Sequence, residues 1–312
     1  LAGARTRVTA VTTPMLIRTY AAWVLPLMFT APLFTQDIYS YLAQAAIVER
    51  GMDPYLAGPV DLLGANDPLA RSVPLIWSHS PSPYGPTALA VAWGIAKITS
   101  DGVIASVFLH RLVAIVSLLV VSWALVQLGR RCGVSSQFTL WLGTLNPLVL
   151  LHLVGGIHNE ALLLALLLVG LELCLRAIHG PAQSMVPDEL PEPGPIGHEN
   201  QSRGRSWALY AGGIVLISLA GMVKVTGFVA LGFAGMWLAR KFGSTWKAVV
   251  LSAVVTGAIT VVTAVVVSLG TGLGFGWITA QGGAATVRSW MSLTTLLGII
   301  AGSVSYTHLT LP

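Results

Sequence analysis

The chain has 312 residues, of which 54% are hydrophobic and 9% are charged, and its formal net charge is +5. A soluble domain carries about 25% charged residues, so this chain cannot cover a water-facing surface. Apolar stretches recur from Pro14 onward, which excludes a single secretion signal followed by a soluble body. The composition predicts an all-α, polytopic membrane protein in contact with the lipid bilayer. We interpret the positive charge as loop charge that sets orientation, not as a nucleic-acid surface.

The two ends of the chain do not look like natural ends. Leu1 is not an initiator methionine, and the last apolar segment breaks after Gly302. Residues 304–312 resemble a translated sequencing adapter and are left out of all functional reasoning. We expect residues 1–303 to be the N-terminal part of a longer transmembrane domain.

A membrane span needs roughly 20 predominantly apolar residues. On that measure we expect about eight spans, at residues 12–34, 112–129, 138–155, 161–178, 207–223, 225–239, 248–269 and, broken, from 293. The apolar piece 87–98 is too short to cross comfortably and is interpreted as a re-entrant or interfacial helix. If it did cross, every later loop would invert.

The distribution of lysine and arginine predicts the orientation. If residues 87–98 do not cross, ten basic residues fall on one side, which is then the cytoplasmic side: Arg5, Arg7, Arg130, Arg131, Arg176, Arg203, Arg205, Arg240, Lys241 and Lys247. The Pro-rich segment 181–205 is expected there as a disordered loop. Cys132 and Cys174 are placed near this face, so no disulfide is expected.

The opposite face receives the long loop 35–86 and a set of mixed charges. Asp37 follows the first span, at the level where a membrane-borne head group meets water, and shares a helix face with Tyr41 and Gln44. A first-turn carboxylate on a helix over 38–49 is the alternative reading. Asp53 and Tyr84 lie in Pro- and Gly-rich turns of this loop, for which anchoring at the membrane surface is also possible.

Two further groups of polar residues belong to the same face. His158, Asn159 and Glu160 follow two glycines, either as site residues or as a tight hairpin capped by Asn159. A metal site is disfavoured, because His152 and His158 are six residues apart and no HExxH spacing occurs. Three cations could hold a phosphate or merely snorkel: Arg111, Lys224 and Arg288.

Five motifs in chain order carry a family resemblance: Gln36-Asp37-Ile38-Tyr39-Ser40-Tyr41, Gly51-Met52-Asp53-Pro54-Tyr55, Pro83-Tyr84-Gly85-Pro86, Asn146-Pro147-Leu148 with Gly155-Gly156-Ile157-His158-Asn159-Glu160, and Val287-Arg288-Ser289-Trp290-Met291-Ser292. Together they resemble the actinobacterial polyprenol-phosphate-mannose-dependent α-(1→6)-mannopyranosyltransferases, which belong to the C-type superfamily of integral membrane glycosyltransferases.

This resemblance implies a hexosyltransferase of the cell membrane with its site on the extracytoplasmic face. It would move mannose from polyprenyl-phosphate mannose to a mannan or lipid-anchored oligomannoside, with Asp37 as catalytic base. The residues expected to bind substrate are Tyr41, Asp53, Tyr84, Arg111, His158, Asn159, Glu160, Lys224 and Arg288. No cofactor is expected. A divalent cation is left open, because many relatives carry two adjacent acids where this chain has Gln36 and Asp37.

Two alternatives remain at this point. An arabinosyl or glucosyl transferase of the same superfamily would share these residues. A transporter or flippase of lipid-linked sugar would line its path with the same cations, although it would also be expected to show inverted repeats, and none is found.

Overall fold

The computed structural model describes residues 11–100, 102–181, 203–280, 297 and 300. Within these residues the protein is all-helical and has no strand. The elements in chain order are α1 (Thr13–Leu27), α2 (Asp37–Glu49), α3 (Pro59–Leu63), α4 (Pro68–Ser72), η1 (Leu75–Trp77), α5 (Pro86–Thr99), α6 (Val103–Arg131), α7 (Ser136–Gly143), α8 (Pro147–Val149), η2 (Leu150–Gly155), α9 (Glu160–His179), α10 (Arg203–Gly221), η3 (Val225–Phe228), α11 (Val229–Lys241), α12 (Trp246–Gly270) and α13 (Trp277–Ala280).

Three of the described helices are long and apolar enough to cross a membrane: α6, α9 and α12. The pair formed by α7 and residues Pro147–Gly155 passes the same test as one span bent by 49°. The structure therefore supports three or four spans in the described part of the chain, where we expected seven. Two of the other expected spans are too short, because α1 and α11 have 15 and 13 residues. At 1.5 Å per residue they reach about 20–23 Å, less than the ~30 Å hydrocarbon core. The third, α10, has 19 residues but is not among the helices that are apolar enough.

The remaining expectations about segments lie outside the described residues. They concern the eighth span from residue 293, most of the 181–205 loop and the tail 304–312.

The bend between α7 and α8 has a local cause. Pro147 has no backbone N–H and therefore cannot continue the hydrogen-bond ladder of α7. Asn146 instead starts a new helix, with its side-chain Oδ1 accepting the Leu148 N–H at 3.0 Å. The following turns, Leu150–Gly155, are π-helical. Such wide turns are rare and occur frequently at functional sites.

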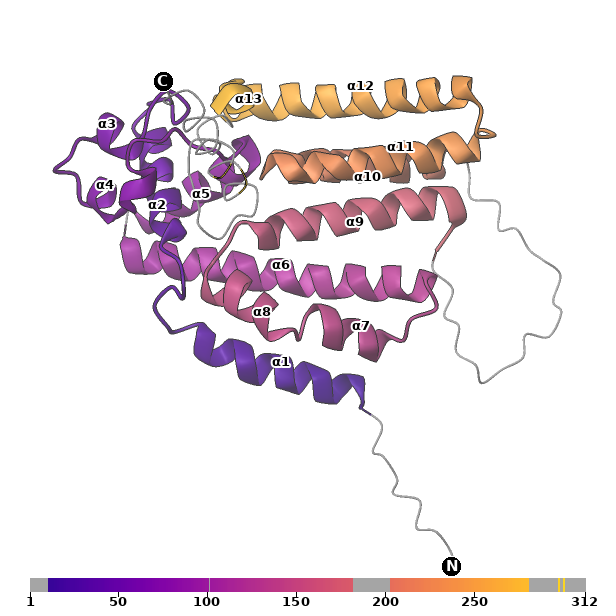
Figure 1. The fold of residues 1–312 in the computed structure, drawn as a ribbon, viewed down its shortest axis with the longest axis horizontal. Helices are drawn as coiled ribbons and strands as arrows, with labels where there is room; N and C mark the ends of the chain where they lie inside the picture. The colour runs from indigo at the N-terminus through magenta and orange to yellow at the C-terminus, as the bar shows by residue number, and fades with distance from the viewer. Residues whose placement is uncertain (1–10, 101, 182–202, 281–296, 298–299, 301–312) are drawn as a thin grey trace, which may run out of the picture.

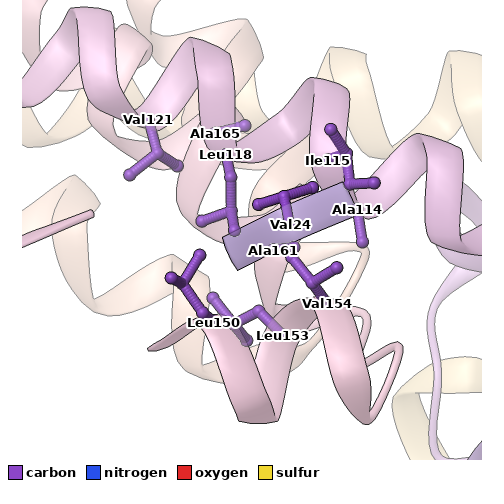
Figure 2. Close-up of a cluster of buried hydrophobic side chains, with 10 residues drawn as sticks. All are labelled: Val24, Ala114, Ile115, Leu118, Val121, Leu150, Leu153, Val154, Ala161 and Ala165. Carbon is purple, nitrogen blue, oxygen red and sulfur yellow. The ribbon is translucent and has the colours of Figure 1, made fainter. Parts of the chain in front are cut away.

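The bundle core joins α1, α6, η2 and α9. Figure 2 shows Val24, Leu118, Val154 and Ala161 from these four elements converging in one cluster of buried apolar side chains. A further close contact joins α9 to α10, because a Cβ at Gly170 would lie 2.7 Å from the Gly213 carbonyl oxygen. Small residues at such a crossing let two membrane helices approach closely.

The two ends of the bundle differ in character. The long helices run side by side (Figure 1). The connections α6–α7 and α11–α12, the end of α9 and the start of α10 all lie at one end. The described basic residues from Arg130 to Lys247 flank the helix ends there, so they share one end of the bundle. Arg5 and Arg7 lie outside the described residues, and the side of the membrane stays a prediction. The helices α2 to α5 lie at the other end (Figure 1).

Helix α5 stays at that second end. Its first turn is tied to the end of α10, where the Thr87 N–H donates to the Met222 carbonyl at 3.3 Å. Its last turn meets the start of α6 through the hydroxyls of Thr99 and Ser106, 2.7 Å apart. Both partners lie at the end of the bundle that carries α2. This placement agrees with a helix that does not cross, as expected for residues 87–98.

Arginines at the basic end also hold helices together. Glu172 of α9 is fully buried and accepts hydrogen bonds from Arg131 and Arg176, with closest distances of 2.7 Å each. A buried carboxylate requires such partners, because an unpaired charge there would cost several kcal/mol. Arg131 therefore ties α6 to α9, whereas Arg176 pairs with Glu172 within α9.

Candidate functional site

Asp37 is the first residue of α2, as the sequence indicated. Its backbone N–H donates to the Thr35 hydroxyl at 3.1 Å, and its carboxylate benefits from the positive end of the helix dipole. The side chain is 29% exposed, and its Oδ2 lies 3.8 Å from Nδ1 of His158. The carboxylate is thus anchored by its backbone and still open to solvent, which is what a proton acceptor for a bound substrate requires.

Tyr41 and Tyr84 form the wall behind this carboxylate. Their rings meet edge to face with centroids 5.1 Å apart, and the Tyr84 hydroxyl donates to the Tyr41 hydroxyl at 3.4 Å. Gln44, one turn further along α2, is buried and accepts a hydrogen bond from the Ser82 hydroxyl. Burial raises the pKa of both phenols above the ordinary value, so they remain neutral. The structure therefore brings Asp37, Tyr41 and Tyr84 together.

Three charged or ionisable neighbours come from two segments: His158 and Glu160 at the start of α9, and Lys224 just before η3. His158 Nδ1 lies 3.7 Å from Glu160 Oε2, and the Lys224 ammonium binds Glu160 Oε1 at 2.5 Å. His158 is 10% exposed, whereas Lys224 is 41% exposed. Because both oxygens near Nδ1 belong to carboxylates, that nitrogen is the one that carries the proton. The result is a row of alternating groups: Asp37, His158, Glu160 and Lys224.

The backbone that presents His158 is strained. Ile157 is buried and has a φ of +57°, which a β-branched residue rarely adopts. Two residues earlier, the carbonyl of Gly155 accepts the Leu33 N–H at 2.9 Å. This bond ties the segment to the connection between α1 and α2. Strain of this kind persists only when packing enforces it, and it concentrates at functional sites.

His152 is a neighbour of the site that sequence reasoning did not include. Its ring stacks on that of His158 with centroids 4.0 Å apart. Six residues of regular α-helix would turn the two side chains away from each other. The π-helical turns and the left-handed Ile157 together produce the contact. The pairing depends on both features, and the sequence gives no clear signal for either of them.

The His158 imidazole gives a testable pH dependence. Burial is the main cause that lowers its pKa below 6.5, and His152 lowers it further, against the opposing effect of Glu160 and Asp37. Below pH 6.5 the unfolded chain binds a proton at His158 that the folded protein excludes, so the free energy of unfolding should decrease as the pH falls.

Thermal unfolding between pH 7.5 and 5 measures this contribution. The wild type should lose stability below pH 6.5, and His158→Gln should lose less of it over the same range. An identical pH profile for both proteins would show that His158 does not contribute.

Arg111 occupies a different position from the one expected for a phosphate ligand. Its side chain is 2% exposed, and its guanidinium donates to three backbone carbonyls, those of Met28 at 2.9 Å, Thr30 at 2.7 Å and Val154 at 3.3 Å. These bonds tie the end of α1 to η2. Two of the three guanidinium nitrogens are thus used by the backbone, whereas Nη2 is buried without a hydrogen-bond partner among the described residues.

The other predicted site residues are Asn159, Asp53 and Arg288. In the described part of the chain, neither Asn159 nor Asp53 makes a hydrogen bond or an ion pair with Asp37. Asn159 stands at the N-cap position of α9 but makes no side-chain capping bond. Asp53 lies beyond the far end of α2, away from Asp37, where its Oδ1 accepts the Tyr55 N–H at 2.8 Å. Arg288 lies outside the described residues. Among the described residues, no three His, Cys, Asp or Glu side chains are placed to hold a metal ion together.

Comparison with known proteins is informative at this point. The chain is 50% identical over 302 residues to alpha-(1->6)-mannopyranosyltransferase B of Corynebacterium glutamicum, covering 96% of this chain and 47% of that protein. It is 42% identical to a probable alpha-(1->6)-mannopyranosyltransferase of Mycolicibacterium smegmatis, covering 92% and 51%. It is 39% identical to an alpha-(1->6)-mannopyranosyltransferase of Mycobacterium tuberculosis, covering 90% and 51%.

The chain spans about half the length of these curated relatives. No solved structure matches it. Residues 1–240 match the family described as alpha-(1->6)-mannopyranosyltransferase, N-terminal domain. The resemblance seen in the motifs is thereby confirmed, and the chain belongs to the alpha-(1->6)-mannopyranosyltransferase family.

Proposed function

We propose that the full-length protein transfers mannose from a polyprenyl-phosphate donor to an oligomannoside acceptor on the extracytoplasmic face, forming an α-(1→6) linkage. The observation that carries this proposal is the row Asp37, His158, Glu160 and Lys224, at the end of the bundle opposite the basic loops. Basic loops favour the cytoplasmic side, which leaves the row on the other side. The family membership supports mannose as the sugar.

In the proposed reaction Asp37 acts as general base. It takes the proton from the acceptor 6-hydroxyl. The hydroxyl oxygen attacks the anomeric carbon of the donor from the face opposite the departing phosphate. The bond between that carbon and the phosphate oxygen breaks, and the phosphate leaves with the electron pair. A phosphate is a good leaving group and needs cations more than a general acid. One carboxylate is therefore enough, unlike the pair that glycosidases use.

His158 would act as a positioning residue for Asp37. Its protonated Nδ1 faces Asp37 Oδ2 at 3.8 Å and Glu160 Oε2 at 3.7 Å, both longer than a hydrogen bond. Catalytic hydrogen bonds are often long without substrate and tighten in the complex. An imidazole N–H at this place would orient the carboxylate toward the acceptor hydroxyl. We propose no step that requires a cofactor or a metal ion.

Lys224 is the described cation best placed for the donor phosphate. One N–H of its ammonium is used by Glu160, and the side chain remains 41% exposed, so two further N–H groups are available to a ligand. Arg288 remains a second proposed phosphate ligand. Glu160 would then hold the ammonium in place and keep it charged.

A double-mutant cycle tests this role of Lys224. Lys224→Gln should raise the KM for the donor by about 10–100-fold, since charge-assisted hydrogen bonds contribute roughly 1.5–3 kcal/mol. The variant also leaves Glu160 unpaired, so the double variant Lys224→Gln with Glu160→Gln is the necessary comparison. The KM should stay high in the double variant. Recovery to the wild-type value would show that Lys224 serves only as the partner of Glu160.

The proposed function itself is tested with membranes from cells that express the full-length gene. Labelled polyprenyl-phosphate mannose and an oligomannoside acceptor should give a product with one more α-(1→6)-linked mannose. Preferred use of an arabinosyl or glucosyl donor would contradict the sugar that we assign. Movement of the donor across the membrane without a new glycosidic bond would indicate a transporter instead.

A further inference from the structure

A cleft opens beyond the last residue of α2, away from Asp37. It has a volume of about 390 Å³ and lies where the turn after α2, helix α5 and the segment after α12 meet. Asp53, Trp93 and residues 271–274 are among its walls. Binding sites for small molecules typically have volumes of ~300–1,000 Å³. Helices α2 and α5 and the end of α12 share one end of the bundle (Figure 1), so the cleft lies at the same end as the proposed site.

Trp93 provides a fixed aromatic wall for this cleft. Its indole N–H donates to the Glu49 carboxylate, and the Lys97 ammonium lies 3.9 Å from the ring centroid. Lys97 is not one of the residues that line the cleft. The indole is therefore held in one orientation by two charged neighbours while part of it faces the cleft. A large rigid ring offers contact area at a low cost in conformational entropy, and the C–H face of a pyranose can pack against it.

Asp53 provides the polar part of the cleft. Its Oδ1 accepts the Tyr55 N–H at 2.8 Å, which fixes the carboxylate. Within the described residues its second oxygen has no protein donor, and the residue is exposed. Asp53 is also the only charged side chain among the described residues that line the cleft. A single carboxylate attracts hydroxyl groups and repels a phosphate, so the cleft suits a neutral polyol.

We infer that this cleft binds a neutral hexopyranose unit of the acceptor glycan, remote from the hydroxyl that reacts at Asp37. The inference rests on the proposed function, because it assigns the distal ligand of the same reaction to the cleft. Helix α2 has 13 residues and is about 20 Å long, and it separates Asp37 from the cleft. A disaccharide is too short to occupy both places, whereas a hexasaccharide is long enough.

Binding measurements without donor test the cleft separately from the reaction. The full-length protein in lipid nanodiscs is titrated with α-(1→6)-linked mannohexaose and with mannobiose. The wild type should bind the hexaose more tightly than the biose. Trp93→Ala and Asp53→Asn should each weaken hexaose binding by about tenfold, which corresponds to 1.4 kcal/mol. Trp246→Ala is the matched control, because Trp246 is exposed at the opposite end of the bundle, and its affinity should equal that of the wild type.

The outcomes separate the cleft from the catalytic proposal. If the hexaose affinity is unchanged in both Trp93→Ala and Asp53→Asn, the proposal that the cleft binds the acceptor is wrong, whatever the transfer assay shows. Conversely, Asp37→Asn could transfer mannose normally while Trp93→Ala binds the hexaose more weakly. That result would exclude Asp37 as the base and still support acceptor binding in the cleft. If Trp93→Ala does not fold, Trp93→Phe and Asp53→Asn decide the question. The phenyl ring keeps an aromatic wall, so the hexaose affinity of Trp93→Phe should lie between the affinities of the wild type and Asp53→Asn.

Discussion

Replacing Asp37 with asparagine is expected to reduce mannosyl transfer by the full-length protein by about 10²–10⁴-fold, the contribution that a general base typically makes. Asparagine keeps the size of the side chain and can still accept a hydrogen bond, but it cannot take the acceptor proton. The backbone bond from residue 37 to the Thr35 hydroxyl does not involve the carboxylate. The variant should therefore insert and fold normally. Transfer is measured in membranes with labelled donor.

Asp61→Asn is the matched control for this experiment. Asp61 lies in the same loop and is 41% exposed, with its carboxylate 2.8 Å from His79 rather than near the site. Its removal should leave transfer within about twofold of the wild type, since surface ion pairs contribute only ~0–1 kcal/mol. Near-normal transfer by Asp37→Asn would exclude Asp37 as the base, and an equal loss in both variants would indicate a general effect on the loop.

The second large effect is expected at Arg111, and it concerns stability rather than donor binding. Arg111→Ala removes three hydrogen bonds from a buried guanidinium to the carbonyls of Met28, Thr30 and Val154. Charge-assisted bonds contribute about 1.5–3 kcal/mol each, so the free energy of unfolding should fall by about 3 kcal/mol or more. The measurement is the midpoint of thermal unfolding in detergent, together with the yield of inserted protein.

Two comparisons make this prediction specific. Arg18 of α1 is exposed, so Arg18→Ala should unfold close to the wild-type temperature. Arg111→Lys should be intermediate, because a single ammonium cannot reproduce the fork of the guanidinium. If Arg111 were a phosphate ligand, Arg111→Ala would keep its thermal stability and show a raised KM for the donor, which is the opposite pattern.

The sequence predicted well those helices whose ends are marked by charge, glycine or proline. Helices α9 and α12 begin and end within two residues of the expected bounds, because long apolar runs with clear ends leave few alternatives. The expected first span reached residue 34, whereas α1 ends at Leu27. The residues that follow are apolar but not helical: their backbone bonds instead to Arg111 of α6 and to Gly155 of η2. Apolar composition alone cannot distinguish such a connection from the last turns of a span.

The candidate site was predicted in part. The spacing of Asp37, Tyr41 and Gln44 over two helical turns predicted their common face, because a helical period is readable from sequence. The meeting of Asp37 with His158 was expected only from a shared face of the membrane. It depends on the strained Ile157 and on the π-helical turn, and neither has a reliable sequence signal. For the same reason His152 was assigned no role. Arg111 was expected as a phosphate ligand or a snorkelling cation, and its bonds to three backbone carbonyls had no sequence signal.

The central claim is that the row from Asp37 to Lys224 faces the extracytoplasmic side while the basic loops face the cytoplasm. One of the two cysteines offers a direct test, since Cys132 is exposed directly after α6, at the basic end, whereas Cys174 is buried. Gln36→Cys adds a thiol next to Asp37, at an exposed position. In intact cells a membrane-impermeant maleimide should label position 36 and should label Cys132 only after permeabilisation. Labelling of Cys132 in intact cells, with position 36 protected until the membrane is opened, would contradict the account.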